Sequence, residues 1–163
     1  MSQLWISKTA FRDMVEEANR AYPMETGGVL VGYFSVFGEP VVFAATGPGP
    51  NAVHLQNRFM PDHTWQCEQL ESLFQKSSGT WVYLGDWHTH PDSSPEMSRL
   101  DQRTLRSIAK YKLAENPHPL MLIGGYSSPH WKWVGYQYRD NCLFRLWVSY
   151  KQCSLSLFPT FNI

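Results

Sequence analysis

The sequence predicts an α/β fold in which a mixed β-sheet is flanked by helices, with residues 1–163 forming a single domain. Three observations support this fold class. Strand-like and helix-like apolar patterns alternate along the chain. Hydrophobic residues make up 43% of it and charged residues 17%, as in folded globular proteins. No linker or internal repeat divides the 163 residues, and this length is enough to bury one core.

The elements follow from local patterns. Those expected in the first half are a strand at 4–7, an amphipathic helix at 9–22 stopped by Pro23, a β-hairpin of 26–34 and 40–46, and a loop at 47–61. Those expected in the second half are a helix at 63–76 capped by Asp62, a strand at 80–90, a helix from Ser98 to Asn116, and strands at 120–125, 131–139 and 142–148. The tail 151–163 is expected to be irregular.

Charge and composition narrow the classes of partner. The net charge is zero and the pI is about 7, whereas nucleic acids and anionic membranes usually bind a basic face. No apolar run approaches the ~20 residues of a membrane helix, and no signal peptide is visible, so we expect a soluble cytoplasmic protein. Cys67, Cys142 and Cys153 contain no Cys-x-x-Cys pair and are interpreted as buried thiols in a reducing compartment.

The most informative segment is His88-Thr-His-Pro-Asp-Ser-Ser-Pro-Glu-Met-Ser-Arg-Leu-Asp101. On a strand, His88 and His90 point to the same face and could chelate one ion, which imidazole and zinc suit well. Pro91 cannot donate to a β-ladder, so the strand should end at the ligands. Asp101, in the first turn of the next helix, could supply a third ligand. Three protein ligands leave one zinc position open for water, as in catalytic sites.

A second interpretation of the same residues is structural. Ser98-x-x-Asp101 at a helix start is close to a capping box, in which the serine bonds a backbone N–H and the acidic side chain reaches back. The capping and ligand interpretations are compatible. Ser98 near a helix N-terminus could also help to hold an anionic oxygen.

A hydrolytic zinc site needs a general base that is not itself a ligand. Glu25 is the candidate, because it directly precedes the predicted strand Thr26–Phe34, which could lie beside the histidine strand. The alternative is that Glu25 is a solvated residue following Pro23 and Met24.

Together these residues resemble the signature of the JAMM/MPN+ (JAB) metalloprotease family: Glu25, His88-x-His90-Pro91, and Ser98-x-x-Asp101. The resemblance implies a cytidine-deaminase-like mixed sheet with flanking helices. It implies that His88, His90 and Asp101 bind Zn²⁺, that Glu25 activates water, and that Ser98 steadies the oxyanion. The implied activity is hydrolysis of the isopeptide or peptide bond after the C-terminal tail of ubiquitin or a ubiquitin-like protein.

The run Gly85–Pro91 is similar to that of small bacterial members, including the deconjugating isopeptidase of anti-phage CBASS systems. A conjugated or ubiquitin-like protein is therefore the expected partner, with no nucleic acid and no membrane. Its C-terminal tail is expected to lie extended along a strand edge, since β-augmentation holds a peptide by its main chain. Phe59 and Met60, in the loop 47–61, are candidates for gripping the globular part of the substrate.

Three other functions are weighed against this one. A catalytically silent scaffold of the same fold would be expected to have lost ligands, and here every signature position is present. A DNA-associated protein like the RadC group is expected to show His-Asn-His-Pro-Ser-Gly, whereas this chain has Thr89 and Asp92-Ser93. The same site could also hydrolyse a small molecule or a sulfur-carrier tail.

Overall fold

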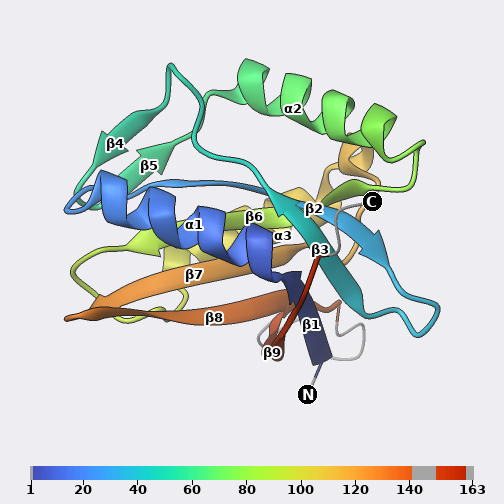
Figure 1. Ribbon diagram of the computed structural model, residues 1–163. Helices are drawn as coiled ribbons and strands as arrows, with labels where there is room; N and C mark the ends of the chain where they lie inside the picture. The colour runs from blue at the N-terminus through green and yellow to red at the C-terminus, as the bar shows by residue number, and fades with distance from the viewer. Residues whose placement is uncertain (1, 141–149, 161–163) are drawn as a thin grey trace.

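The computed structural model describes residues 2–140 and 150–160. Their elements, in chain order, are β1 (Ser2–Ser7), α1 (Lys8–Ala21), β2 (Gly27–Phe34), β3 (Pro40–Ala45), β4 (Val53–Leu55), β5 (Arg58–Met60), α2 (His63–Lys76), β6 (Val82–His90), α3 (Arg99–Lys110), the short 3₁₀ helix η1 (Lys112–Ala114), β7 (Leu120–Ser127), β8 (His130–Tyr138) and β9 (Tyr150–Phe158). The mixed sheet with flanking helices is confirmed (Figure 1).

The sheet closes on itself in the order β1-β3-β2-β6-β7-β8-β9, with β9 returning to β1. Parallel pairing of β6 with β7 and of β1 with β3 and β9 is combined with antiparallel pairing elsewhere. Helix α1 packs on β1 and β3, α2 lies over β2 and β6, and α3 packs on β8 (Figure 1). No described helix has the length and apolar character that a membrane span requires.

Two buried clusters hold these layers together. The larger one fills the space between α1 and the sheet and includes Leu4, Met14, Leu30, Trp87 and Leu122. The smaller one lies beneath α3 and is built from Leu105, Met121, Ile123, Tyr136 and Tyr138. Because β6 contributes Trp87 to the larger cluster, its intervening residues face the opposite side of the sheet.

The C-terminal tail corrects the prediction most clearly. It is strand β9 over Tyr150–Phe158, where the sequence predicted an irregular segment. Only Cys153 of this strand is buried, so its burial lacks the strict alternation by which a strand is recognised. Its pairing with both β1 and β8 is non-local. The predicted strand 142–148 lies outside the described residues.

Three smaller predictions are also corrected. The predicted loop 47–61 contains the two short strands β4 and β5, which pair with each other. Helix α3 ends at Lys110, six residues earlier than predicted, and Leu113 is 80% exposed. Cys67 is exposed rather than buried, and Gln66 is the one buried residue of helix α2. Cys153 is buried, as predicted.

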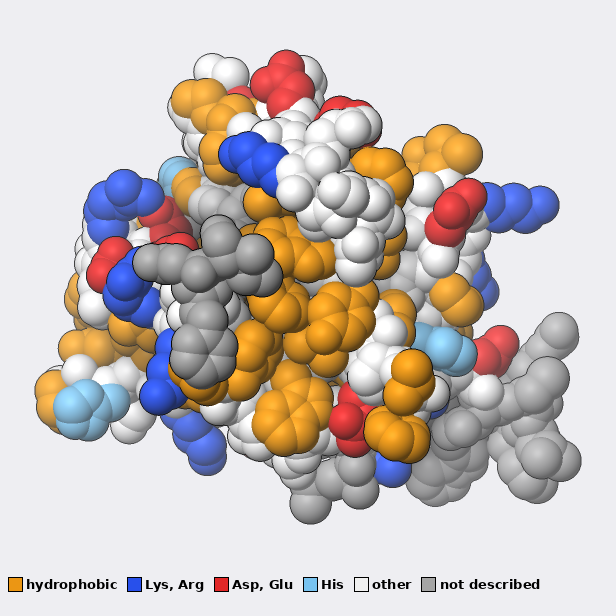
Figure 2. Space-filling view, turned by 45° about the vertical axis from the view of Figure 1, so that its right-hand side comes forward, with side chains coloured by type: hydrophobic (Ala, Val, Ile, Leu, Met, Phe, Trp, Pro, Cys, Tyr) orange, Lys and Arg blue, Asp and Glu red, His pale blue; other side chains and the backbone are white. Residues whose placement is uncertain are grey.

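The two ends of the sheet differ in character. The tip of the β2–β3 hairpin lies at the right of Figure 1, and hydrophobic side chains gather on the face that Figure 2 brings forward. Near that hairpin, Phe43 contacts Tyr33, Trp81 and Phe158, with ring centroids 5.0–5.7 Å apart. At the opposite end lie the β4–β5 hairpin, the start of β2 and the end of β6 (Figure 1). The predicted site residues gather at this opposite end.

Candidate metal centre and active site

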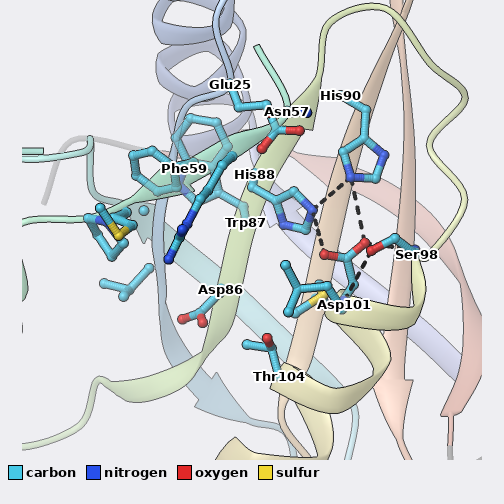
Figure 3. Close-up of a pocket in the computed structure, with 17 residues that line it drawn as sticks. Glu25, Asn57, Phe59, Asp86, Trp87, His88, His90, Ser98, Asp101 and Thr104 are labelled. Carbon is cyan, nitrogen blue, oxygen red and sulfur yellow. Dashed lines mark hydrogen bonds and ion pairs between the residues drawn. The ribbon is translucent and has the colours of Figure 1, made fainter. Parts of the chain in front are cut away.

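The two histidines lie at the end of β6, as predicted. Strand β6 ends at His90, and Trp87 and Thr89 are buried on the other side of the sheet. His88 and His90 therefore share one face, with their Nε2 atoms 3.1 Å apart (Figure 3). Imidazole nitrogens that approach this closely converge on a common point.

Asp101 reaches the same point from α3. Its Oδ1 lies 3.3 Å from His88 Nε2 and its Oδ2 lies 3.6 Å from His90 Nε2. The capping box is also present, since Ser98 Oγ accepts from the Asp101 N–H and Asp101 Oδ2 accepts from the Ser98 N–H. The capping interpretation of Ser98-x-x-Asp101 is therefore confirmed, and it remains compatible with the ligand interpretation. The cap holds the carboxylate in place beside the histidines.

Among the described residues, these three side chains form a group whose ligand atoms are close enough together to hold one metal ion. Ligand atoms about 2.0–2.1 Å from one zinc ion at tetrahedral angles lie about 3.3 Å apart. The observed separations of 3.1, 3.3 and 3.6 Å are close to that value. Two imidazoles and a carboxylate are also a donor set that zinc accepts, so the residues fit the ion.

The orientation of His90 supports the same conclusion. Its Nδ1 lies 3.1 Å from the carbonyl oxygen of Ser94, which can only accept, so Nδ1 donates the hydrogen. In the neutral ring Nε2 then carries the free lone pair and faces Asp101. A carbonyl behind a histidine commonly fixes a metal ligand in this way.

The loop that presents Ser94 is itself anchored. A Cβ on Gly125 would lie 2.4 Å from Pro95 N, so the absence of a side chain there lets the loop approach the sheet. Tyr136 Oη donates to the carbonyl of Pro95 over 3.0 Å. These contacts hold the Ser94 carbonyl behind the His90 ring.

Electrostatics couple these groups. Burial acts to raise the pKa of Asp101, but hydrogen bonds with His88 and His90 lower it well below its usual range. Burial acts to lower the pKa of His90, but the Asp101 carboxylate and the Ser94 carbonyl raise it. The carboxylate is therefore ionised and ready to bind a cation.

Glu25 lies beside the two histidines because β2 pairs with β6. Gly27 is the register partner of His88, and the Thr89 N–H donates to the carbonyl of Thr26 over 2.9 Å. The Glu25 side chain borders the same cavity as the two histidines (Figure 3). Burial raises the pKa of Glu25, whereas the nearby His88 and His90 act to lower it. A carboxyl group placed in this way suits proton transfer.

The β4–β5 hairpin forms one wall of the cavity and contains the predicted Phe59 and Met60. The Glu25 N–H donates to the carbonyl of Leu55 over 2.8 Å, and His54 Nδ1 donates to the carbonyl of Glu25 over 2.9 Å. The sequence alone indicated no role for His54. It has no ligand spacing, and its role depends on how the loop folds.

Asp86 is a further cavity residue to which the sequence analysis gave no role. It lies two residues before His88 on the same face of β6 and accepts a hydrogen bond from Tyr83 Oη over 2.7 Å. Burial raises the pKa of Asp86, whereas that hydrogen bond lowers it. The sequence shows that Asp86 and Trp87 face opposite sides of the strand. It does not show that the β4–β5 hairpin forms a cavity wall opposite Asp86.

Comparisons with known proteins agree with this geometry. Residues 7–135 match the model of the family described as prokaryotic homologs of the JAB domain. A "Probable metalloprotease y4qB" of Sinorhizobium fredii is 34% identical over 146 residues, which are 86% of this chain and 88% of the relative. A "CD-NTase/cGAS isopeptidase" of Enterobacter hormaechei is 31% identical over 126 residues, covering 74% of this chain and 66% of the relative.

A second "CD-NTase/cGAS isopeptidase", from Escherichia coli, is 28% identical over 118 residues, covering 72% of this chain and 70% of the relative. Among solved structures, the protein DSY2949 of Desulfitobacterium hafniense superposes with a TM-score of 0.72. It is 19% identical, and the match covers 98% of this chain and 96% of that one. At that identity the likeness concerns the fold alone.

Proposed function

The chain belongs to the family of prokaryotic homologs of the JAB domain, and from this premise we propose that it is a zinc-dependent peptidase of the JAMM type. Its reaction is hydrolysis of an isopeptide or peptide bond after the C-terminal tail of a conjugated or ubiquitin-like protein. The observation that carries the proposal is the convergence of His88 Nε2, His90 Nε2 and an Asp101 carboxylate oxygen on one point beside Glu25. The relatives named metalloprotease and isopeptidase support it.

The proposed roles follow from position. A zinc ion held by His88, His90 and Asp101 would act as a Lewis acid on the scissile carbonyl and lower the pKa of a bound water toward ~7. Glu25 takes a proton from the attacking water and passes it to the leaving amine nitrogen. This role requires that Glu25 borders the cavity and does not itself bind the metal, and its side chain does border the cavity. The peptide C–N bond breaks as that nitrogen is protonated.

Ser98 is assigned to the developing oxyanion. Its Oγ already accepts from the Asp101 N–H, so the hydroxyl hydrogen remains available to donate. A preorganised donor of this kind typically contributes 10²–10³-fold in rate, about 3–4 kcal/mol. The N-terminal end of α3 also favours negative charge there.

The substrate is proposed to enter as an extended tail between β6 and the β4–β5 hairpin. Phe59 and Met60 border that space, and Met60 is 41% exposed, which supports a role in contacting the substrate. We also assign residues 1–163 to one domain, because β9 lies beyond the matched residues 7–135 and still pairs with β1 and β8. The relatives named CD-NTase/cGAS isopeptidase support an anti-phage setting.

The test uses the purified chain with an isopeptide-linked ubiquitin-like conjugate, a linear fusion and a conjugated nucleotidyltransferase. We expect cleavage of at least one, its loss with a chelator, and its return with added zinc. Glu25→Gln should abolish cleavage, whereas Glu68→Gln, on the exposed side of α2, should not. Metal-independent cleavage would refute the proposal. Absence of cleavage combined with stable binding of a conjugate would favour the silent scaffold.

A further inference from the structure

The cavity extends beyond the catalytic centre, on the side of His88 away from His90. Its volume is about 390 Å³, and it runs between the face of β6, the start of α3 and the β4–β5 hairpin (Figure 3). Apolar side chains, including Val29, Met60, Leu100 and Met121, line much of the cavity, and Val29 and Met121 are the register partners of Asp86 on the two neighbouring strands. Ligand-binding clefts of this kind usually owe their specificity to the few polar groups among such residues.

Asp86 and Thr104 are two of the polar residues that line the cavity. Asp86 lies on β6 two residues before His88, and Thr104 lies on α3 one turn after Asp101 (Figure 3). Asp86 Oδ1 accepts a hydrogen bond from the hydroxyl of Tyr83. Among residues 2–140 and 150–160, no hydrogen bond or ion pair involves Asp86 Oδ2. Asp86 Oδ2 is accessible to solvent, and its lone pairs are free to accept a hydrogen bond from a ligand.

A purely structural role for Asp86 is the rival explanation. Tyr83 is half-buried and its hydroxyl needs a partner, which Asp86 provides. That role uses one oxygen only and does not require the side chain to border the cavity. Arg58 of the hairpin also borders the cavity, yet no ion pair between it and Asp86 is formed in the described part of the chain.

Two hollows flank the catalytic centre, and they differ in lining. The one beyond His90 is lined mainly by polar side chains, among them Gln56, Asn57, Asp92 and Ser93. The one that ends at Asp86 follows the strand face for at least two residues, about 7 Å. An extended tail fits the apolar hollow along the strand face, and the leaving lysine fits the polar one. Glu25 borders both, as a residue that carries a proton to the leaving nitrogen should.

Building on the proposed function, we infer that Asp86 determines which tails the site accepts. Its carboxyl group accepts a hydrogen bond from a nitrogen donor on the tail side chain that lies over it. Arginine, lysine, glutamine or asparagine is therefore preferred there over an apolar side chain of similar length. Because side chains alternate along an extended peptide, the preference is confined to one position within three residues of the scissile bond.

The test measures binding and requires no turnover. Metal-loaded Glu25→Gln protein, the full chain, is incubated with a pool of acetylated tail peptides, each joined through its C-terminus to the Nε of a reporter lysine. Retained peptides are identified by mass spectrometry. We expect nitrogen donors to be enriched about ten- to hundredfold at one position, as for a hydrogen bond to a charged group.

Variants of Asp86 separate selection from structure. Adding Asp86→Ala should reduce the enrichment to less than about twofold. Adding Asp86→Asn should reverse it toward acceptors such as glutamate, because the amide oxygen keeps the Tyr83 hydroxyl as donor and the amide NH₂ faces the cavity. Adding Tyr83→Phe, the matched control, should leave the preference for donors in place.

The inference is overturned if no position is selected, or if Asp86→Ala and Asp86→Asn retain the original preference while binding zinc at the same stoichiometry. The proposed function is tested separately by exposing the same pool to protein with Glu25 intact. Peptides that are retained but never cut would refute hydrolysis and leave the role of Asp86 standing. If the same peptides are cut whether or not Asp86 is replaced, hydrolysis stands and the role of Asp86 is refuted.

Discussion

Gly27 is the position at which a single methyl group should damage the site most directly. A Cβ there would lie 2.3 Å from the Trp87 carbonyl oxygen, 2.9 Å from Phe59 Cε1 and 3.0 Å from His88 Cβ. Ordinary van der Waals contact begins at 3.4 Å, so Gly27→Ala must push β2 and β6 apart by about 1 Å. Two of the three contacted residues belong to the histidine strand β6 and the third to the β4–β5 hairpin.

The cost follows from the hydrogen bonds that this displacement breaks. The Thr89 N–H donates to the Thr26 carbonyl over 2.9 Å, and the Thr26 N–H donates to Thr89 Oγ1 over 3.0 Å. A separation of about 1 Å takes both beyond hydrogen-bonding range. At about 0.5–1.5 kcal/mol each, the free energy of unfolding falls by about 1–3 kcal/mol, which agrees with the usual cost of overpacking.

Thermal unfolding and zinc titration test this estimate. In a domain of this size we expect the Tm of Gly27→Ala to fall by about 3–10 °C. Because Gly27 pairs with His88, zinc affinity should fall about tenfold or more. The control is Gly47→Ala, since a Cβ on Gly47 would meet no atom within 4 Å. A Gly27→Ala protein with wild-type Tm and zinc affinity would refute the reasoning.

Three further predictions concern the cap, the buried network and pH. Ser98→Ala should cost about 1 kcal/mol of stability and keep the metal, whereas Asp101→Asn should lower zinc affinity more than about hundredfold, as read by metal analysis. Thr26→Val, which leaves the buried Glu17 carboxylate without its 2.9 Å donor, should lower the free energy of unfolding by about 1–3 kcal/mol in urea. Burial raises the pKa of the Cys153 thiol from 9.0 to about 11, so its contribution is fully present below pH 9 and is lost between pH 9 and 11 as the unfolded chain ionises. The stability gap between wild type and Cys153→Ala should therefore shrink by about 2 kcal/mol over that range.

Local patterns identified the parts of this fold that depend on local forces. Helix α1 before Pro23, helix α2 with its Asp62 cap, and the β2–β3 hairpin all have the predicted type and nearly the predicted bounds. The same is true of the histidine strand, because His88 and His90 occupy alternate positions against the buried Trp87. Periodicity and capping act within a few residues, so one sequence is enough to reveal them.

The parts that were missed depend on distant contacts. Strand β9 exists because β1 and β8 offer it hydrogen-bonding edges, and neither edge is visible in the pattern of 150–158. The β4–β5 hairpin is also held from outside, through the 2.8 Å hydrogen bond from Glu25 to Leu55. Helix α3 ends at Lys110, and the next three residues, Tyr111, Lys112 and Leu113, are exposed, so a longer helix would gain little packing there.

The site was predicted to the extent that it follows from spacing. His88, His90, Ser98 and Asp101 are close in sequence, and strand and helix geometry bring them together. Glu25 is 63 residues away from His88, and it reaches the centre only because β2 lies beside β6. His54 and Asp86 have no motif, and their places became evident only with the hairpin wall and the cavity.

The account depends most on Glu25 acting as a base beside a metal that it does not bind. The measurement that tests this most directly is zinc content and cleavage rate on the same preparations of wild type and Glu25→Gln. We predict one zinc ion per chain in both proteins and a cleavage rate at least about 10²-fold lower in Glu25→Gln. A Glu25→Gln protein that cleaves at the wild-type rate, or that loses its zinc, would contradict the account.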